Sequence, residues 1–202
     1  MPSNKFTTVN IRDYFQKNGN GEIGEDSLVK VLSNFSCPLN QNVEKFLKEQ
    51  AIEFTKKNQS VTYLVFSKED AALARYFSLA SKPIEVKSNL FSKTMQRKIS
   101  RVSEYNSEHQ VFHLSAYLIA QFGKNFKENA NKIITGQELM ELARCKIQEL
   151  QYMLGGMVAF LEAEANEKLL DFYTKQNDFK IFDTRRANSV KQEQLVQMLA
   201  TL

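Results

Sequence analysis

The sequence predicts an α/β protein whose mixed central sheet is parallel at its centre, flanked by helices and preceded by an N-terminal helical extension. The first observation behind this is that runs rich in β-branched and aromatic residues alternate along the chain with amphipathic segments of helical period. The second is the composition of the 202 residues, 43% hydrophobic and 25% charged, which is typical of globular proteins. The third is a supply of 15 Phe and 7 Tyr, enough for an aromatic core without Trp.

The N-terminal part of the chain is expected to be helical. Residues 9–17 carry apolar side chains at helical spacing, and residues 25–35 begin with acidic side chains, which favour a helix N-terminus. Residues 42–57 predict the clearest early helix, because an apolar stripe lies opposite Glu and Lys. We therefore expect a helical extension over residues 1–34 and a main domain over residues 35–185.

The middle of the chain predicts strands. Residues 60–67 and 73–81 are rich in β-branched and aromatic side chains and are expected to form a hairpin, with Pro83 ending its second strand. Residues 111–123, VFHLSAYLIAQFG, form a long apolar run with β-branched and aromatic members. This run is expected to be the central strand of the sheet.

Helices and strands alternate over the rest of the chain. Residues 137–151 predict a strong amphipathic helix, which Gly155 and Gly156 end. The remaining expected elements are a strand at 157–163, a helix at 166–176, a strand at 179–183 and a helical tail at 186–202.

The start of the helix at 137–151 is a candidate anion site. Thr135 and Glu138 have the spacing of a capping box, in which a threonine and a glutamate three residues later bind each other's backbone N–H groups. A helix N-terminus attracts anions, and Lys124, Lys127 and Lys132 precede this one. The pattern predicts a cradle for a pyrophosphate, and an ordinary capped helix after an exposed basic loop is the alternative.

Metal and disulfide chemistry find no support in the sequence. Cys37 and Cys145 lie far apart without a partner pattern, so neither a disulfide framework nor a zinc site is expected. His109 and His113 fall in a loop-to-strand region where their spacing does not create a shared face. The sequence has no apolar signal-peptide region and no long apolar span, so we expect a cytoplasmic protein that does not enter a membrane.

The segment FLEAEANEKLLDFYTKQNDFKIF, residues 160–182, resembles the closing segment of the GNAT family of acyl-CoA-dependent N-acetyltransferases. In that family a strand leads to an Asn, then to a helix ending in Phe-Tyr, then to Gly-Phe before the last strand. Here the matching residues are Asn166, Phe172 and Tyr173, and Asp178 takes the place of the family glycine. IAQFGKN is likewise similar to the end of the family's central strand.

The resemblance implies acetyl-CoA as co-substrate and no metal. The backbone of Phe122, Gly123 and Lys124 would pair with the pantetheine arm. The loop that would hold the pyrophosphate keeps one family glycine and consists of Asn131, Lys132, Ile133, Ile134, Thr135 and Gly136.

The resemblance also implies roles for residues near the C-terminus. Tyr173 would be the general acid that protonates the leaving thiolate, and the alternative is a core tyrosine packed beside Phe172. Glu162 would be the base, and the alternative is a side chain that faces solvent. Asn166 and Phe172 would contact the cofactor, although capping of the following helix is the simpler role for Asn166.

Within the family, residues 35–54 are similar to the first segment of toxin-type acetyltransferases. The implied function is transfer of an acetyl group to a primary amine on an aminoacyl-tRNA, a protein or a small molecule. This branch also allows a tRNA, an antitoxin-like partner and a homodimer.

Two other functions stay open. The first is a catalytically silent GNAT-derived module that acts through its surface, because the pyrophosphate loop has lost glycines. The second is an RNA- or DNA-binding protein, which depends only on the basic residues 93–101. The equal alternative for these residues is a solvated surface loop. The net charge of +4, from 27 basic and 23 acidic residues, is too small to indicate a dedicated nucleic-acid binder.

Overall fold

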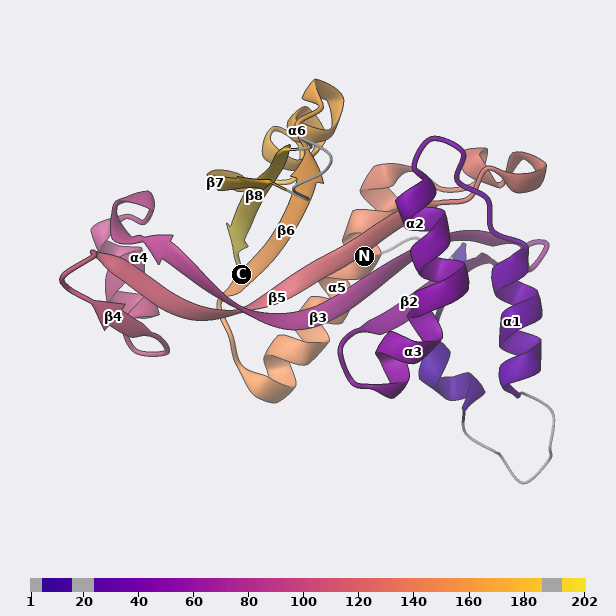
Figure 1. Cartoon of the computed structure of the whole chain (residues 1–202), viewed down its shortest axis with the longest axis horizontal. Helices are drawn as coiled ribbons and strands as arrows, with labels where there is room; N and C mark the ends of the chain where they lie inside the picture. Colours follow the sequence, from indigo (N-terminus) through magenta and orange to yellow (C-terminus); the bar gives the residue numbers. More distant parts are fainter. Residues whose placement is uncertain (1–4, 16–23, 187–193) are drawn as a thin grey trace. The chain divides into compact units, whose positions relative to one another are not determined.

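The computed structural model describes residues 5–15, 24–186 and 194–202. Eight strands form one mixed sheet in the order β1-β2-β3-β5-β6-β8-β7, with β4 paired to β5, and helices flank it (Figure 1). This confirms the predicted α/β class and the central position of the strand expected at 111–123, which is β5 (Val111–Lys124). The chain divides into two compact units, residues 1–80 with 119–146 and residues 81–118 with 147–202.

The first unit packs helices against strands. Its elements are β1 (Phe6–Asn10), α1 (Glu25–Ser33), α2 (Gln41–Lys45), α3 (Ala51–Lys56), β2 (Val61–Ser67), the first part of β3 (Leu73–Lys87), the end of β5 and the start of α5 (Gly136–Leu154). β2 pairs antiparallel with both β1 and β3, which confirms the predicted hairpin. Leu28 of α1, Leu47 between α2 and α3, and Leu64 of β2 meet in one buried core, so these helices cover one face of the strands (Figure 1).

The helix predicted at 9–17 is wrong. Residues 6–10 form β1, which pairs with β2 from Phe6 opposite Ser67 to Asn10 opposite Tyr63, and a short 3₁₀ turn, Ile11–Tyr14, follows. The apolar spacing that suggested a helix spans about one turn, too little to outweigh pairing with a neighbouring strand. The rest of the predicted segment lies outside the described residues.

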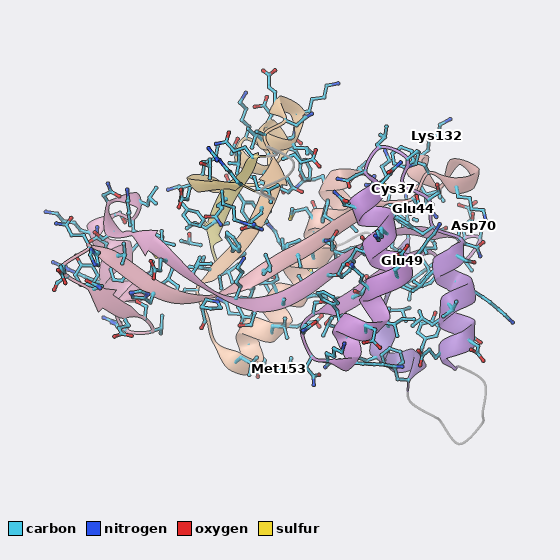
Figure 2. All side chains as sticks on the ribbon, viewed as in Figure 1. Cys37, Glu44, Glu49, Asp70, Lys132 and Met153 are labelled. Atoms are coloured by element: carbon cyan, nitrogen blue, oxygen red, sulfur yellow. The ribbon has the colours of Figure 1, made fainter. Side chains whose placement is uncertain are left out.

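The helix predicted at 42–57 is present but not uniform. α2 and α3 are joined by a π-helical segment, Phe46–Gln50. In α2, the Glu44 carboxylate accepts a hydrogen bond from the backbone N–H of Cys37 at 2.7 Å and binds the Lys48 ammonium at 2.6 Å (Figure 2). These contacts anchor the loop before α2.

The second unit contains the rest of the sheet. Its elements are the later part of β3, α4 (Lys93–Ile99), β4 (Glu104–Asn106), the first part of β5, the end of α5, β6 (Val158–Glu164), α6 (Glu167–Thr174), β7 (Lys180–Arg186) and β8 (Gln194–Thr201). Its core brings together Val86, Phe112, Phe160 and Leu199 from four of these strands. The predicted strand, helix and strand between 157 and 183 are confirmed as β6, α6 and β7.

The helical tail predicted at 186–202 is wrong, because residues 194–201 form β8. This strand pairs antiparallel with β6 on one side and β7 on the other, and Met198 is fully buried. Residues 187–193 lie outside the described part. The apolar spacing of the tail suits either a helix or a strand, and the two neighbouring strands decide between them.

Two further expectations about the middle of the chain are corrected. β3 does not end at Pro83 but continues to Lys87. The pairing of β2 with β3 stops at Leu79, so Pro83 lies past the end of β2, where a missing N–H costs no hydrogen bond to that strand. Residues 93–99 of the basic segment form the helix α4 rather than a loop.

Candidate functional site

The predicted capping box at the start of α5 is confirmed. The backbone N–H and the hydroxyl of Thr135 donate to Glu138 Oε2 at 2.8 and 2.9 Å, and the Glu138 N–H donates to Thr135 Oγ1 at 3.1 Å. α5 then runs for 19 residues. The N–H groups of Gly136 and Gln137 precede the first intrahelical hydrogen bonds, so the helix itself offers them no acceptor.

A buried arginine lies beside this helix start. Arg75 of β3 is 6% exposed, and its guanidinium donates through Nε and Nη2 to the carbonyl of Ile134, the Nε bond being 2.9 Å long. Burial lowers the pKa of Arg75 to about 10, and the negative charge of Glu138 opposes that shift. Arg75 therefore stays cationic at neutral pH next to the predicted pyrophosphate loop.

Lys124 adds a second cation. Burial and the charge of Arg75 lower the pKa of the Lys124 ammonium, which lies 5.3 Å from the centre of the Phe126 ring. Lys132 is exposed on the outside of the turn (Figure 2), whereas Lys127 donates to Asn34 Oδ1 at 2.8 Å. Lys124 is thus the loop lysine that shares the electrostatic environment of Arg75.

The groups at the start of α5 suit an anionic ligand. The helix N-terminus carries partial positive charge and N–H groups without intrahelical acceptors, and Arg75 and Lys124 add two full charges. Glu138 offsets part of this potential. The sequence reasoning missed Arg75, although it is the single charged side chain within the strand segment LARYFSLAS, and a lone charge in such a run is a usable signal.

Gly123, predicted to face the pantetheine arm, has a structural requirement of its own. A Cβ atom at this position would lie 2.1 Å from Cε1 of the Tyr76 ring, which is fully buried. Phe122 is half-buried. The close approach of strand and ring explains the glycine without any ligand.

Asn125 fixes the end of β5. Its amide donates to the carbonyls of Leu73 and Asn34 at 2.7 and 3.1 Å, and its Oδ1 accepts from the N–H groups of Ser36 and Lys127 at 2.9 and 3.0 Å. Asn125 is 3% exposed, so these bonds satisfy a buried side chain and hold the loop that follows. Sequence analysis gave it no role, since its partners lie far away along the chain.

Tyr173, the predicted acid, lies in the second unit. It is 7% exposed and packs edge-on against Phe172 and Phe179, with ring centres 5.1 and 6.1 Å away. Burial raises the pKa of Tyr173 to about 12. The phenol is therefore protonated at neutral pH, and it also makes the core contacts that were the alternative to a catalytic role.

Glu162, the predicted base, is held in an ion pair. Arg185 binds it through Nε at 2.7 Å and Nη2 at 2.5 Å, and Gln197 donates to it at 2.7 Å. Burial by itself raises the pKa of Glu162, but the hydrogen bonds from Arg185 and Gln197, together with the charges of Lys82 and Arg185, lower it below its ordinary value. Its side chain is 13% exposed, which does not fit the alternative that it simply faces solvent, and its partners work against a role as a free base.

Asn166 and Asp178 delimit the α6 region. Asn166 Oδ1 accepts from the N–H groups of Lys168 and Leu169 at 3.0 and 3.4 Å, which confirms the predicted helix cap. Asp178 has a φ of 56°, in the left-handed region that favours glycine. This conformation suits the glycine that the GNAT family has at the position matching Asp178.

Across residues 5–15, 24–186 and 194–202, no three His, Cys, Asp or Glu side chains are grouped so that they could hold a metal ion. No helix within the same ranges is both long and apolar enough to span a membrane.

Comparisons with known proteins give a likeness of fold. No family model matches the sequence, and no curated protein matches it either. A tyrosine-to-phenylalanine variant of KacT aligns at a TM-score of 0.62 with 17% identity, covering 98% of this chain and 95% of that chain.

Two AtaT structures give similar values. AtaT complexed with acetyl-methionyl-tRNAfMet aligns at a TM-score of 0.59 with 14% identity and coverage of 95% and 93%. AtaTR bound with acetyl-CoA aligns at 0.60 with 15% identity and coverage of 98% and 95%. The identities are low and the coverage is nearly complete, so the comparisons confirm that the chain has the predicted GNAT fold, in the form seen in KacT and AtaT.

Proposed function

We propose that this protein transfers an acetyl group from acetyl-CoA to a primary amine. The observation that carries the proposal is the cationic start of α5, where Arg75 and Lys124 lie beside the capping box of a long helix. The fold supports it, because structures of that fold include AtaTR bound with acetyl-CoA.

In this scheme the loop before α5 binds the cofactor. Backbone N–H groups of the loop Asn131–Gly136, with the charges of Arg75 and Lys124, hold the pyrophosphate. The backbone at Phe122 and Gly123 pairs with the pantetheine arm.

Tyr173 supplies the proton. The amine loses its proton and attacks the thioester carbonyl, and the CoA thiolate leaves as Tyr173 donates a proton to it. The raised pKa of Tyr173 keeps that proton available at neutral pH. Glu162 acts as the base only if its carboxylate exchanges Arg185 for the acceptor amine. Asn166 and Phe172 contribute by fixing the start and end of α6 around Tyr173.

Solved structures of the same fold suggest the acceptor and the partners of this protein. AtaT complexed with acetyl-methionyl-tRNAfMet supports an aminoacyl-tRNA acceptor ahead of a protein or small-molecule amine. The structure of AtaT bound to the C-terminus of the antitoxin AtaR supports an antitoxin-like partner. We also propose that the protein is cytoplasmic and that it forms a homodimer.

The first test is calorimetric titration with acetyl-CoA. We expect a Kd in the micromolar range, which corresponds to a binding free energy of about −8 kcal/mol. Gly136→Glu places a carboxylate at the helix N-terminus and should weaken binding at least about tenfold more than Gly136→Gln, a control of nearly equal size without the charge. The absence of heat at millimolar acetyl-CoA would overturn the proposal.

A second test separates catalysis from the catalytically silent module, which the loss of loop glycines favours. Thiol release from acetyl-CoA is followed with aminoacyl-tRNA, peptide and small-molecule amines, for the wild type and for Tyr173→Phe. We expect amine-dependent release that falls about 100-fold or more in Tyr173→Phe. Binding without release for any amine would establish the silent module instead.

A further inference from the structure

Residues 87–101, from the end of β3 through α4, carry a run of basic side chains. Residues 86–103 contain no Asp or Glu, and the nearest acidic residues are Glu85 and Glu104. The basic residues of this segment are Lys87, Lys93, Arg97, Lys98 and Arg101, and all of them are exposed. We call these five residues the basic face.

Buried contacts hold the basic face in place. Phe91 and Ile99, at the two ends of α4, pack into the core of the second unit with Phe112. The Gln96 amide donates to the carbonyls of Ser88 and Phe91 at 2.8 and 3.0 Å, and Ser92 caps the helix. α4 therefore buries its apolar side and presents its cations to solvent on a fixed scaffold.

Among the described residues, no ion pair involves a cation of the basic face. Several exposed lysines elsewhere do pair with acidic residues, as in the pairs Lys45–Glu49, Lys56–Glu25, Lys57–Glu53 and Lys175–Asp171. Lys93 and Arg97 are four residues apart on α4 and therefore lie on the same side of the helix. In other helices of this protein, a lysine has an acidic residue at that spacing. Five exposed cations between Lys87 and Arg101, with no acidic residue among them in the sequence, suit a polyanion.

An aromatic side chain follows the cations. Tyr105 of β4 lies four residues after Arg101 and is 45% exposed. It also packs on Phe112, with ring centres 4.8 Å apart, so its position is fixed while part of it stays open to solvent. Positive charge with an exposed aromatic ring is the combination that binds unpaired nucleotides, whose phosphates need cations and whose bases stack on aromatic rings.

We propose that the basic face, with Tyr105, is a docking surface for a single-stranded or looped segment of RNA. The phosphates contact the basic residues and an unpaired base stacks on Tyr105. This surface belongs to the second unit and uses none of the groups assigned to acetyl-CoA. The inference deepens the proposed aminoacyl-tRNA acceptor, on which it rests for the choice of RNA, and RNA binding is measured separately from acetyl transfer.

The test measures RNA affinity by fluorescence anisotropy across a salt series, using labelled oligouridine and unfractionated tRNA. Arg97→Glu/Lys98→Glu reverses two charges of the basic face. Lys30→Glu/Lys180→Glu makes the same change in net charge at exposed lysines of α1 and β7 and serves as the matched control. We expect Arg97→Glu/Lys98→Glu to bind RNA at least about tenfold more weakly than wild type, and the control to stay within about twofold of wild type. The slope of log K against log salt should be shallower by at least about 1.4 for Arg97→Glu/Lys98→Glu than for wild type.

A second variant tests the aromatic contact. Tyr105→Leu should weaken RNA binding about fivefold or more without changing the salt slope, because stacking does not release counterions. Equal RNA affinity of Arg97→Glu/Lys98→Glu and its control would overturn the proposal. So would tight binding of polyglutamate with no binding of either RNA, which would assign the surface to an acidic protein. Acetyl-CoA titration of the same variants should match wild type, and a failure of the wild type to bind acetyl-CoA leaves the RNA result unaffected.

Discussion

Arg75 and Asn125 are buried polar side chains that hold the loop after β5. Arg75 binds the carbonyl of Ile134, and Asn125 binds backbone groups of Leu73 and Asn34. A buried polar group that loses its partners costs about 1–3 kcal/mol, so each of these side chains favours one loop conformation. The proposed cofactor loop is positioned by residues that need not touch the cofactor.

At the same scale, the ionisation of Tyr173 can be measured. We expect a difference titration of tyrosinate absorbance, wild type minus Tyr173→Phe, to show one phenol that ionises only near pH 12. Because the folded pKa is raised above its unfolded value, this stabilisation is complete below about pH 10 and is lost as pH rises toward 12, with a total on the order of 2–3 kcal/mol. A difference spectrum that titrates near pH 10 would show that Tyr173 is open to solvent.

The ion pair of Glu162 makes an opposite prediction for acid. The folded pKa of Glu162 is lowered, so the pair stabilises the protein above the ordinary glutamate pKa of about 4.3 and this contribution is lost as pH falls through the folded value. We expect Arg185→Ala to lower the free energy of unfolding by about 1–3 kcal/mol at pH 7. Urea denaturation at pH 7 and pH 3 measures this, with Lys180→Ala on the same strand as control. A loss as large at pH 3 as at pH 7 would contradict the ion-pair explanation.

At the scale of elements, helix starts were predicted well because their signals are local. The starts of α5 and α6 depend on Thr135 with Glu138 and on Asn166, all within one turn of the residues they cap. Strand prediction fails at the ends of the chain, where the residues of β1 and β8 have the apolar spacing of helices. A strand needs hydrogen-bond partners that are distant in sequence, and local spacing does not show them.

The side-chain cap at the start of α5 should contribute measurably to stability. Thr135→Ala removes the hydroxyl that accepts the Glu138 N–H, and we expect the free energy of unfolding to fall by about 1 kcal/mol, within a range of about 0.5–2 kcal/mol. Thr135→Ser keeps the hydroxyl and should stay within about 0.5 kcal/mol of wild type. Urea denaturation followed by circular dichroism measures both. Equal losses for the two variants would show that the methyl group, and not the cap, matters.

For the whole molecule, the C-terminal strand is a structural necessity rather than an appendage. β8 lies between β6 and β7, and Met198 is fully buried. Met198→Ala should therefore cost about 2–5 kcal/mol of stability, whereas Gln194→Ala at the exposed start of the same strand should cost less than about 0.5 kcal/mol. Thermal and urea unfolding test this. A small loss for Met198→Ala would contradict the buried position of β8.

Local sequence signals are enough to predict the α/β class, the central strand and the capped starts of α5 and α6, because periodicity and capping depend on residues only a few positions apart. Long-range contacts, in contrast, make residues 6–10 and 194–201 strands, place Pro83 inside β3 and pair Glu162 with Arg185. They also bring Arg75 to the start of α5, across 59 residues of sequence. These features depend on partners far away along the chain, and such partners become neighbours only when strands pair and the core closes.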